Sequence, residues 1–308
     1  MTYDLIIIGG GPAGTAAAVY AARKQLKTAI ITVEFGGQSV VSDKIFNWIG
    51  TPEISGSDLA KNLKTHTEYY RGEFLDIVES AKVTKIEKTD AGFTITASNG
   101  STYDTKTILV TTGSSRKKLM VPGADTFENK GVVYCASCDG PLFSGSPVAV
   151  IGGGNAGFES AAQLLAYCPT VYLVHHRDTF KADPVTVEKL SAHPNIKILT
   201  NTETLEVTGE KFVNGLRVKN KDTGVEETLA VNGVFVEIGQ IPNTDYLGDL
   251  VQKNEFGNIK IDPWTQQSTL PGIWAAGDCT DVHYHQNNIA AGDAVKAVED
   301  IYMVLKAK

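Results

Sequence analysis

The chain has 308 residues, of which 42% are hydrophobic and 20% are charged. This length corresponds to about two domains of ~100–200 residues each, and the composition is that of a folded globular protein rather than a disordered or collagen-like chain. The 35 acidic and 28 basic side chains give a net charge of −7. That acidic balance argues against nonspecific binding to nucleic acid and against docking on an anionic membrane surface.

The N-terminal segment lacks the features of an export signal. It carries Asp4 where a secretory signal carries Lys or Arg. Glycines and a proline interrupt the uncharged run from Leu5 to Ala22, which suits a strand, a tight turn and a helix better than a membrane span. The four cysteines are too few for a disulfide scaffold, and two of them form a C-x-x-C pair. We therefore expect a cytoplasmic protein with no membrane span.

A glycine-rich turn follows the first apolar strand, which is predicted at residues 3–8. The turn has the pattern G-x-G-x-x-G at Gly9, Gly11 and Gly14, and a helix is predicted from Pro12 to Arg23. This order is typical of a dinucleotide-binding unit, in which backbone N–H groups and the helix N-terminus approach a pyrophosphate. One such fingerprint is weak evidence, because a glycine turn with no ligand is the alternative.

The same unit occurs a second time later in the chain. A strand at residues 148–151 leads into the G-x-G-x-x-G turn Gly152–Gly157, then into a helix predicted to run through Tyr167 and another strand. After each unit, a predicted hairpin leads to a strand that ends in a glycine, at Gly113 and at Gly239. The chain is therefore predicted to be an α/β protein with two Rossmann-like, three-layer dinucleotide-binding domains.

The residue twenty-five positions after the first glycine differs between the two copies. It is Glu34 in the first copy and Arg177 in the second. A carboxylate suits a free ribose hydroxyl, whereas Arg177, with His176 beside it and Lys181 nearby, suits an additional 2′-phosphate. The alternative is that these basic side chains are only the solvated end of a strand, because Asp178 adjoins them and His176 need not be charged at neutral pH.

Cys135 and Cys138 form the pair that we expect to carry the chemistry. Two thiols separated by two residues at a turn or helix start can close a small disulfide, and nearby partial positive charge lowers a thiol pKa. Asp139 is positioned to donate or accept a proton when the leaving thiolate forms. Half of a zinc site and an inert buried pair are the alternatives, but no second C-x-x-C completes a zinc tetrahedron. We expect Cys168 and Cys279 to be small core residues.

A strand, a glycine and an acid also occur near the C-terminus. The strand is followed by Gly277 and Asp278, and a helix is predicted over residues 288–305. The dipole at the start of this helix would stabilise negative charge on a bound ring system when that ring is reduced.

A double dinucleotide fold with a C-x-x-C-D motif in its second copy resembles the low-molecular-weight thioredoxin reductases and the related flavoprotein subunit of alkyl hydroperoxide reductase. The resemblance covers nearly the whole chain. It rests on both glycine turns, on the C-x-x-C-D motif and on four further segments, which are Gly36-Gly37-Gln38 with Asn47-Trp48, Thr111-Thr112-Gly113, Gly239 to Thr244, and Ala276-Gly277-Asp278 with Gln286.

The resemblance implies FAD on the first copy and a nicotinamide dinucleotide, NADPH or else NADH, on the second; it implies no metal ion. The residues implied for FAD are Gly9, Gly11, Pro12, Ala13, Gly14, Glu34, Gly37, Gln38, Asn47, Val83, Thr112, Gly113, Gly277, Asp278 and Gln286. The residues implied for the nicotinamide dinucleotide are Gly154, Asn155, Ala156, Gly157, His176, Arg177, Lys181 and Gly239. The FAD-binding domain would be discontinuous, with residues 1–113 and 245–308. The domain that binds NAD(P)H and carries the cysteine pair, residues 114–244, would be inserted into it.

The activity that the resemblance implies is thioredoxin-disulfide reduction. Hydride passes from the nicotinamide to the flavin, the flavin reduces the disulfide, and the dithiol reduces thioredoxin or a similar small dithiol protein. Cys138 would face the flavin, Cys135 would attack the partner's disulfide, and Asp139 would manage the proton. In this family the inserted domain rotates, so the crossings near Gly113 and Gly239 are the expected hinges. The resemblance also implies a homodimer.

Two departures from the family pattern concern the donor and the partner. Reductases that use NADPH commonly have His-Arg-Arg followed by a further Arg, whereas this chain has His175-His176-Arg177 and then Lys181, which weakens bidentate phosphate binding. The hydroperoxide reductase flavoprotein has an additional N-terminal thioredoxin-like domain, whereas this chain begins at the FAD strand. We therefore expect a separate thioredoxin or glutaredoxin-like partner.

Three alternatives share this fold. Some relatives take electrons from ferredoxin or another donor, and dithiol oxidases of the same fold form disulfides and pass electrons to oxygen. These relatives tend to lose the nicotinamide turn or the acid after the second cysteine, whereas this chain keeps Gly152–Gly157 and Asp139. A flavin-bound redox sensor with slow turnover is the third alternative, and no added interaction tail supports it.

Overall fold

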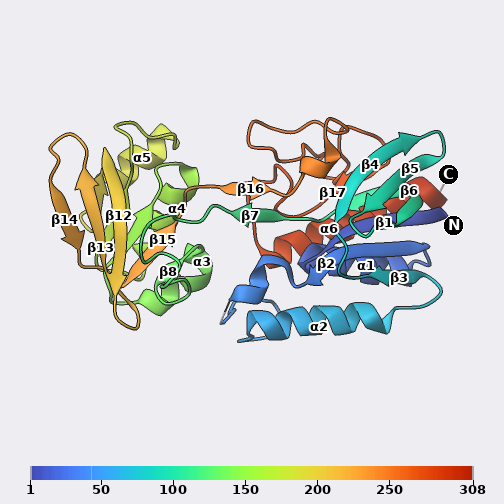
Figure 1. Ribbon diagram of the computed structural model, residues 1–308, viewed down its shortest axis with the longest axis horizontal. Coiled ribbons are helices and arrows are strands. Elements are labelled where there is room, and N and C mark those ends of the chain that lie inside the picture. The colour runs from blue at the N-terminus through green and yellow to red at the C-terminus, as the bar shows by residue number, and fades with distance from the viewer. Residues whose placement is uncertain (1, 43, 307–308) are drawn as a thin grey trace. The chain divides into compact units, whose positions relative to one another are not determined.

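The computed structural model describes residues 2–42 and 44–306, and the chain forms two compact units (Figure 1). Unit 1 consists of Met1–Ser115 and Ile241–Lys308, and unit 2 consists of Arg116–Gln240. The chain passes between the units in two strands, β7 (Ser114–Arg116) and β16 (Gln240–Pro242), which pair with each other. Unit 1 is therefore discontinuous in sequence, whereas unit 2 is one continuous segment.

Unit 1 is built on a seven-stranded sheet with the order β3-β2-β1-β6-β5-β4, and β17 pairs with β6. Its strands are β1 (Thr2–Gly10), β2 (Thr28–Phe35), β3 (Leu75–Val78), β4 (Val83–Thr89), β5 (Gly92–Ala97), β6 (Thr102–Val110) and β17 (Ile273–Ala275). Its helices are α1 (Pro12–Arg23), α2 (Gly56–Tyr69) and α6 (Asn287–Lys306), with short 3₁₀ turns η1 (Gly37–Val41) and η3 (Asp245–Leu247). Strands β1, β2, β3, β6 and β17 run parallel to one another, as expected for a dinucleotide fold. Strand β5 runs antiparallel to both β4 and β6.

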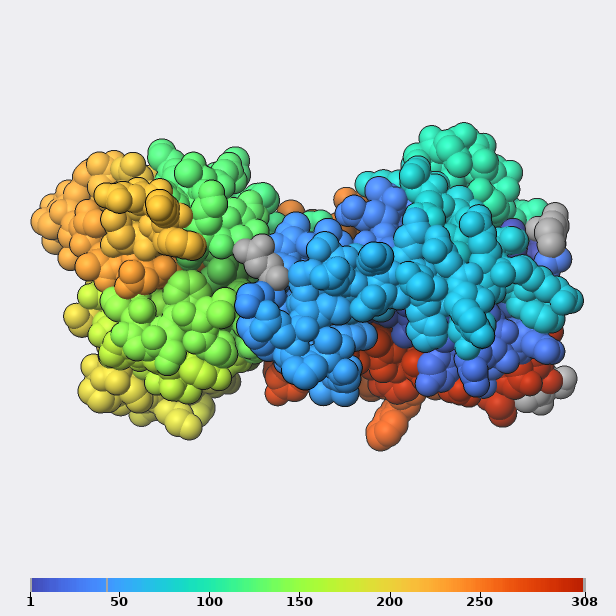
Figure 2. All heavy atoms as spheres, turned by 90° about the horizontal axis from the view of Figure 1, so that it is seen from below, coloured from blue at the N-terminus to red at the C-terminus, as the bar shows by residue number. Residues whose placement is uncertain are grey.

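Strand β1 is buried on both faces, which explains its unbroken apolar sequence. Leu5 and Ile7 belong to the core that contains the inward sides of α1 and α6. Ile6 and Ile8 belong to a second core on the other face, with side chains from β4 and β5. Helix α2 lies on the outside of unit 1, where Figure 2 shows the blue segment around it as part of the molecular surface.

Unit 2 is built on a five-stranded parallel sheet with the order β11-β10-β9-β15-β8. These strands are β8 (Val132–Val133), β9 (Val148–Ile151), β10 (Val171–Val174), β11 (Ile196–Leu199) and β15 (Gly233–Val236). An antiparallel sheet contains β12 (Thr202–Gly209), β13 (Val213–Asn220) and β14 (Glu226–Leu229). The helices are α3 (Ala136–Asp139), α4 (Asn155–Leu164) and α5 (Pro184–Ser191), with the 3₁₀ turn η2 (Gly140–Phe143).

Three layers make up unit 2. On one face of the parallel sheet, Val148 and Val150 pack with Phe158 and Leu164 of α4. On the other face, Ala149 shares a core with the antiparallel sheet. The predicted α/β class with two dinucleotide-binding folds is thus confirmed. No helix among residues 2–42 and 44–306 has the length and apolar character that crossing a bilayer requires.

The structure differs from the sequence-based elements in two places. Helix α4 ends at Leu164 instead of continuing through Tyr167, because the N–H groups of Ala166 and Tyr167 donate to carbonyls three residues back and tighten the chain into a turn. The two hairpins also differ. Strand β6 continues from its hairpin with β5 into the main sheet, whereas β14 ends in the separate antiparallel sheet before β15 begins.

The packing of α4 on the parallel sheet generates a stability prediction. Phe158 is fully buried, and its ring lies edge-on to Phe180 at a centroid distance of 5.0 Å. Phe158→Ala should therefore lower the free energy of unfolding of unit 2 by about 3–5 kcal/mol, because it leaves a cavity. Chemical denaturation followed by circular dichroism measures this loss. The control is Phe212→Ala in the same unit, whose side chain is 66% exposed and whose removal should change stability by less than about 0.5 kcal/mol. Similar losses for both variants would contradict the assigned core.

Candidate functional site

The first glycine turn brings helix α1 very close to the end of β1. A Cβ on Gly14 would overlap the carbonyl oxygen of Gly9, and Gly9 itself has φ +114°, in the region that favours glycine. Helix α1 begins after Gly11, which has no side chain to cap it, and Pro12 occupies its first turn. The first-turn N–H groups, such as that of Ala13, are therefore positioned to bind an anionic group at this helix end.

Two distant segments meet this turn. A Cβ on Gly37 would lie 3.4 Å from the Cα of Gly11, so the backbone after β2 approaches the turn directly. A Cβ on Gly277 would lie 3.1 Å from that of Ala290 in α6 and 3.7 Å from that of Ala13 in α1. The glycines thus leave a cradle of bare backbone, which the side chains of other residues at these positions would fill. An extended dinucleotide needs such a space to approach the backbone closely.

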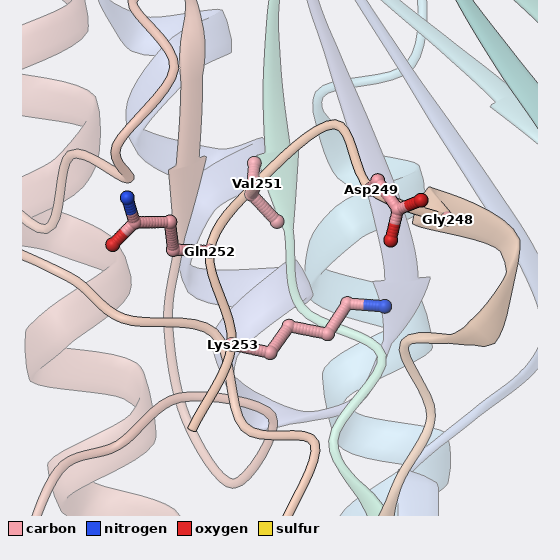
Figure 3. Close-up of a pocket in the computed structure, with 5 residues that line it drawn as sticks. All are labelled: Gly248, Asp249, Val251, Gln252 and Lys253. Carbon is pink, nitrogen blue, oxygen red and sulfur yellow. The ribbon is translucent and has the colours of Figure 1, made fainter. Parts of the chain in front are cut away.

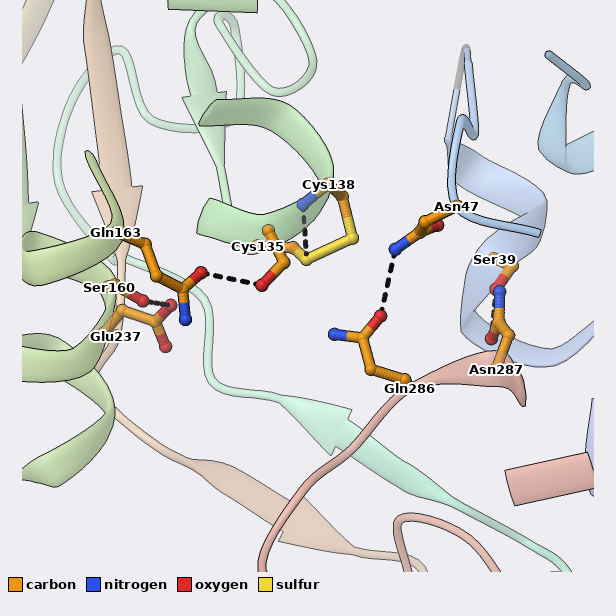
Figure 4. The surroundings of a disulfide bond; sticks show 10 residues. Ser39, Asn47, Cys135, Cys138, Ser160, Gln163, Glu237, Gln286 and Asn287 are labelled. Carbon is orange, nitrogen blue, oxygen red and sulfur yellow. Dashed lines mark hydrogen bonds between the residues drawn. A yellow bond between two sulfur atoms is a disulfide. The ribbon is translucent and has the colours of Figure 1, made fainter. Parts of the chain in front are cut away.

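Polar side chains from separate segments are joined beside this cradle (Figure 4). Nδ2 of Asn47 donates to Oε1 of Gln286 at 3.0 Å, the bond drawn in Figure 4. Nδ2 of Asn288 donates to the Asn47 carbonyl at 2.7 Å. Nε2 of Gln38 donates to the Ser114 carbonyl. The two bonds of Asn47 connect the segment after η1 to the start of α6, so the structure brings Asn47 and Gln286 together as partners. The bond of Gln38 connects η1 to β7.

The other residues predicted for the first site lie at the carboxyl ends of the central strands or in the core. Glu34 is an exposed side chain near the end of β2, and Asp278 is half-buried after β17. Thr112 and Gly113 follow β6, and Oγ1 of Thr112 donates to the carbonyl of Asn243 at 2.7 Å. Val83 is 2% exposed and packs in the core, so its side chain is not available to a ligand.

The second glycine turn repeats the geometry of the first. A Cβ on Gly157 would overlap the carbonyl oxygen of Gly152, and α4 begins after Gly154 with no side-chain cap. Ala156 is exposed in the first turn, and Oδ1 of Asn155 accepts the N–H of the residue that caps α5, at 2.8 Å. This helix start offers first-turn N–H groups in the same way as α1 does.

Basic side chains lie beside this second turn, after β10. His176, Arg177 and Lys181 are all exposed, and Nε of Arg177 donates to Nε2 of His176 at 3.1 Å. The N–H of Lys181 donates to the carbonyl of Gly153 at 3.1 Å, which fixes this segment against the glycine turn. His175 is different, because its ring is buried under Gly153 and burial lowers its pKa. Gly239 lies after β15, is exposed, and has φ +107°.

Cys135 and Cys138 form a disulfide at the start of α3, with their Cα atoms 5.3 Å apart (Figure 4). The N–H of Cys138 donates to Sγ of Cys135 at 3.1 Å, so Cys135 caps the short helix. This hydrogen bond would stabilise negative charge on Sγ of Cys135 once the disulfide is reduced. Oγ of Ser137 donates to Oε1 of Gln163 at 2.7 Å and fastens α3 to α4.

Two carboxyl groups in unit 2 have a raised proton affinity. Burial raises the pKa of Asp139, beside Cys138, to about 6, and the charge of Arg116 opposes this shift. Burial also raises the pKa of Glu237 to about 7, against a hydrogen bond from Ser160. Sequence reasoning identified Asp139 but missed Glu237. The available signal was a charged residue placed directly after the buried strand Gly233–Val236.

The remaining cysteines and the pocket near η3 lie outside this chemistry. Cys168 and Cys279 are buried free thiols, and burial raises the pKa of Cys168 to about 11 and that of Cys279 to about 12. Within the part of the chain that the structure describes, no three His, Cys, Asp or Glu side chains are grouped to hold a metal ion. A pocket in unit 1 contains none of the predicted site residues (Figure 3); its lining is Gly248, Asp249, Val251, Gln252 and Lys253.

Comparison with known proteins places the chain among flavoprotein reductases. Residues 3–294 match the family model described as pyridine nucleotide-disulphide oxidoreductase. The chain is 42% identical over 295 residues to a subunit of the alkyl hydroperoxide reductase of Staphylococcus aureus strain NCTC 8325 / PS 47 and 39% identical to a protein named NADH dehydrogenase of Bacillus subtilis strain 168. Each alignment covers 96% of this chain and 57% of the relative, so the chain spans little more than half the length of these relatives.

Solved structures of similar length match as well. The thioredoxin reductase from Streptococcus pyogenes MGAS5005 has a TM-score of 0.90 and 32% identity over 100% of this chain and 99% of its own. The thioredoxin reductase from Giardia duodenalis has a TM-score of 0.92 and 29% identity over 99% of both chains. With its two glycine turns and its Cys135–Cys138 disulfide, the chain belongs to the pyridine nucleotide-disulphide oxidoreductase family.

Proposed function

We propose that this protein is a thioredoxin-disulfide reductase that uses FAD and NAD(P)H to reduce thioredoxin or a similar small dithiol protein. The observation that carries the proposal is the half-buried Cys135–Cys138 disulfide next to a protonatable Asp139, in a unit that also holds a glycine turn for a dinucleotide. The solved thioredoxin reductases that the chain resembles over its full length support this choice.

The residues around the first turn fit FAD. The bare backbone at Gly11, Gly14 and Gly37 would accept the pyrophosphate, and Glu34 would accept the ribose hydroxyls. Gly277 and Asp278, at the carboxyl end of β17, would hold the central part of the cofactor, with Asn47 and Gln286 toward its ring. When bound, the flavin supplies a two-electron relay between a nicotinamide donor and a disulfide.

The residues around the second turn fit a nicotinamide dinucleotide. The start of α4 would bind the pyrophosphate, and Arg177 with Lys181 would bind the adenosine ribose or its 2′-phosphate. Arg177 favours NADPH. At the position of His176, related reductases have a second arginine, and the exposed imidazole ring found there in this chain leaves NADH as the alternative.

The cysteine pair would then pass two electrons to the partner's disulfide by thiol–disulfide exchange. Two electrons, which the bound flavin would supply, break the bond between Sγ of Cys135 and Sγ of Cys138 and leave two thiolates. Asp139 gives its proton to the thiolate of Cys138, so Cys135 stays a thiolate. Sγ of Cys135, stabilised by the N–H of Cys138, attacks the partner's disulfide and forms a mixed disulfide. Sγ of Cys138 returns its proton to Asp139, attacks Sγ of Cys135 in the mixed disulfide and restores the internal disulfide. The two exchange steps release the partner's two sulfurs as thiolates, which take up protons from water and give the dithiol. A homodimer in the cytoplasm, with hinges near Gly113 and Gly239, completes the proposal.

Anaerobic stopped flow tests this order of electron transfer. Fast bleaching of the flavin by NADPH or by NADH is expected, and its absence in protein that dithionite still reduces would turn the search to ferredoxin-type donors or to a dithiol oxidase. Cys138→Ser should keep the bleaching and abolish thioredoxin reduction, because only the later step needs this thiol. A variant that loses the bleaching itself would show that the assigned order is wrong.

The choice between the two nucleotides depends on Arg177. Arg177→Ala should weaken NADPH binding by about tenfold or more, because a charged hydrogen bond to phosphate is lost, and should change NADH binding much less. Isothermal titration with the oxidised nucleotides NADP⁺ and NAD⁺ measures both affinities. Arg217→Ala, an exposed arginine on β13, is the matched control and should alter neither. Equal losses for both nucleotides in Arg177→Ala would refute the 2′-phosphate role.

Asp139 gives the reaction a characteristic pH dependence. A proton donor with a pKa of about 6 is protonated below that pH, so the turnover rate with thioredoxin should fall as pH rises above about 6 when this proton transfer limits the rate. Asp139→Asn should lower turnover by about 10²-fold or more and remove this pH dependence. Ser137→Ala, on the same helix, lacks a titrating group and should keep the shape of the wild-type profile. An unchanged profile in Asp139→Asn would exclude Asp139 as the donor.

A further inference from the structure

Glu237 occupies the position in unit 2 where the strand order reverses. In the order β11-β10-β9-β15-β8, the chain runs from β9 through α4 to β10 on one side, and β15 lies on the other side of β9. Glu237 is the first residue after β15, and its N–H donates to the carbonyl of Ile151 at 2.8 Å. Ligands of parallel α/β sheets bind at the carboxyl ends of the strands at such a point.

The second glycine turn and α4 hold this side chain in place. A Cβ on Gly152 would overlap the Glu237 carbonyl, so the turn lies directly against the Glu237 backbone. Oγ of the buried Ser160 donates to Oε1 of Glu237 at 2.6 Å, as Figure 4 shows. This bond uses one carboxyl oxygen and leaves the acceptor capacity of the other for a ligand.

The direction of a bound dinucleotide follows from the same topology. The basic side chains after β10, represented by Arg177, mark the adenosine end of the site. With the pyrophosphate at the start of α4, the nicotinamide half must extend the opposite way across β9, toward the end of β15. Glu237 is an acidic residue at that end, directly after β15.

The charges around Glu237 allow its carboxyl group to change protonation near neutral pH. Burial raises its pKa to about 7, and the neighbouring carboxylate of Glu159 adds to the shift. The hydrogen bond from Ser160 and the positive charge of Arg116 act against it. A cation brought next to this group would therefore favour the charged carboxylate and release a proton.

We propose that Glu237 contacts the nicotinamide half of the dinucleotide and discriminates between its redox forms, because its carboxylate attracts the positively charged oxidised ring and not the neutral reduced ring. Loss of a hydride removes two electrons and one proton from the reduced ring and leaves it with a single positive charge. Glu237 would stabilise that charge and so favour hydride release toward the flavin. This role depends on the nicotinamide donor of the proposed function.

Isothermal titration of the oxidised, FAD-loaded protein tests the proposal without turnover. The probes are NAD⁺, its neutral 1,4,5,6-tetrahydro analogue, which cannot donate a hydride, and ADP-ribose, which has no nicotinamide; the NADP⁺ series replaces them if it binds more tightly. Glu237→Gln keeps the size and the Ser160 partner. At pH 8 this substitution should weaken binding of the oxidised form about tenfold, because one nearby charge is lost. It should change the affinities for the neutral analogue and for ADP-ribose by less than about twofold.

The pH dependence provides a second readout. Affinity of wild type for the oxidised form should rise between about pH 6 and 8 as Glu237 loses its proton, and Glu237→Gln should lack this rise. Ser160→Ala removes a hydrogen bond to the carboxylate and should move the rise to higher pH. Glu227→Gln, an exposed carboxylate on β14, is the matched control and should behave as wild type.

The outcomes separate this inference from the proposed function. If wild type binds the oxidised form and Glu237→Gln weakens all three probes equally, or none of them, Glu237 does not discriminate the redox forms and the inference is wrong. If folded, flavin-loaded wild type binds none of the probes in either series, the nicotinamide donor itself is wrong and the role of Glu237 is lost with it.

Discussion

The close approach of a helix start to the end of the preceding strand is the constraint on which both units depend. Gly14 against the Gly9 carbonyl, and Gly157 against the Gly152 carbonyl, leave no room for a side chain. Because the backbone is bare at these positions, the helix dipole and the first N–H groups can reach an anionic ligand with nothing between them. Substitution at either glycine would push the helix from the sheet and would damage the core and the ligand site together.

Desolvation supplies the chemistry that this framework orients. Asp139 and Glu237 are both carboxyl groups that burial makes harder to ionise, yet the roles proposed for them differ. Asp139 adjoins the sulfur pair, where a proton is needed when a thiolate leaves. Glu237 lies at the end of β15, where a positive charge would appear on a ligand. In these proposed roles, the same physical effect prepares one acid to give its proton to sulfur and the other to release its proton when a cation binds nearby.

Local pattern was sufficient for much of this molecule. The helix over Pro12–Arg23, the apolar strand before Gly9 and the C-x-x-C pair could all be identified from spacing, because each depends on neighbours in sequence. The pairing of Asn47 with Gln286, and of Glu237 with Ser160, could not, because each joins residues far apart in the chain. The end of α4 was also missed, since a final turn that tightens by i to i+3 bonds has no strong sequence signal.

The discontinuity of unit 1 has a consequence for synthesis on the ribosome. Helix α6 packs against α1, and β17 completes the sheet beside β6, but both are translated only after all of unit 2. Unit 2 is continuous and can fold as soon as it emerges, whereas the N-terminal segment must wait with the α6-facing side of α1 uncovered. Bringing the ends of a loop this long together costs about 4 kcal/mol if the loop is flexible. A folded unit 2, whose two ends run side by side in β7 and β16, removes most of that cost before the last helix arrives.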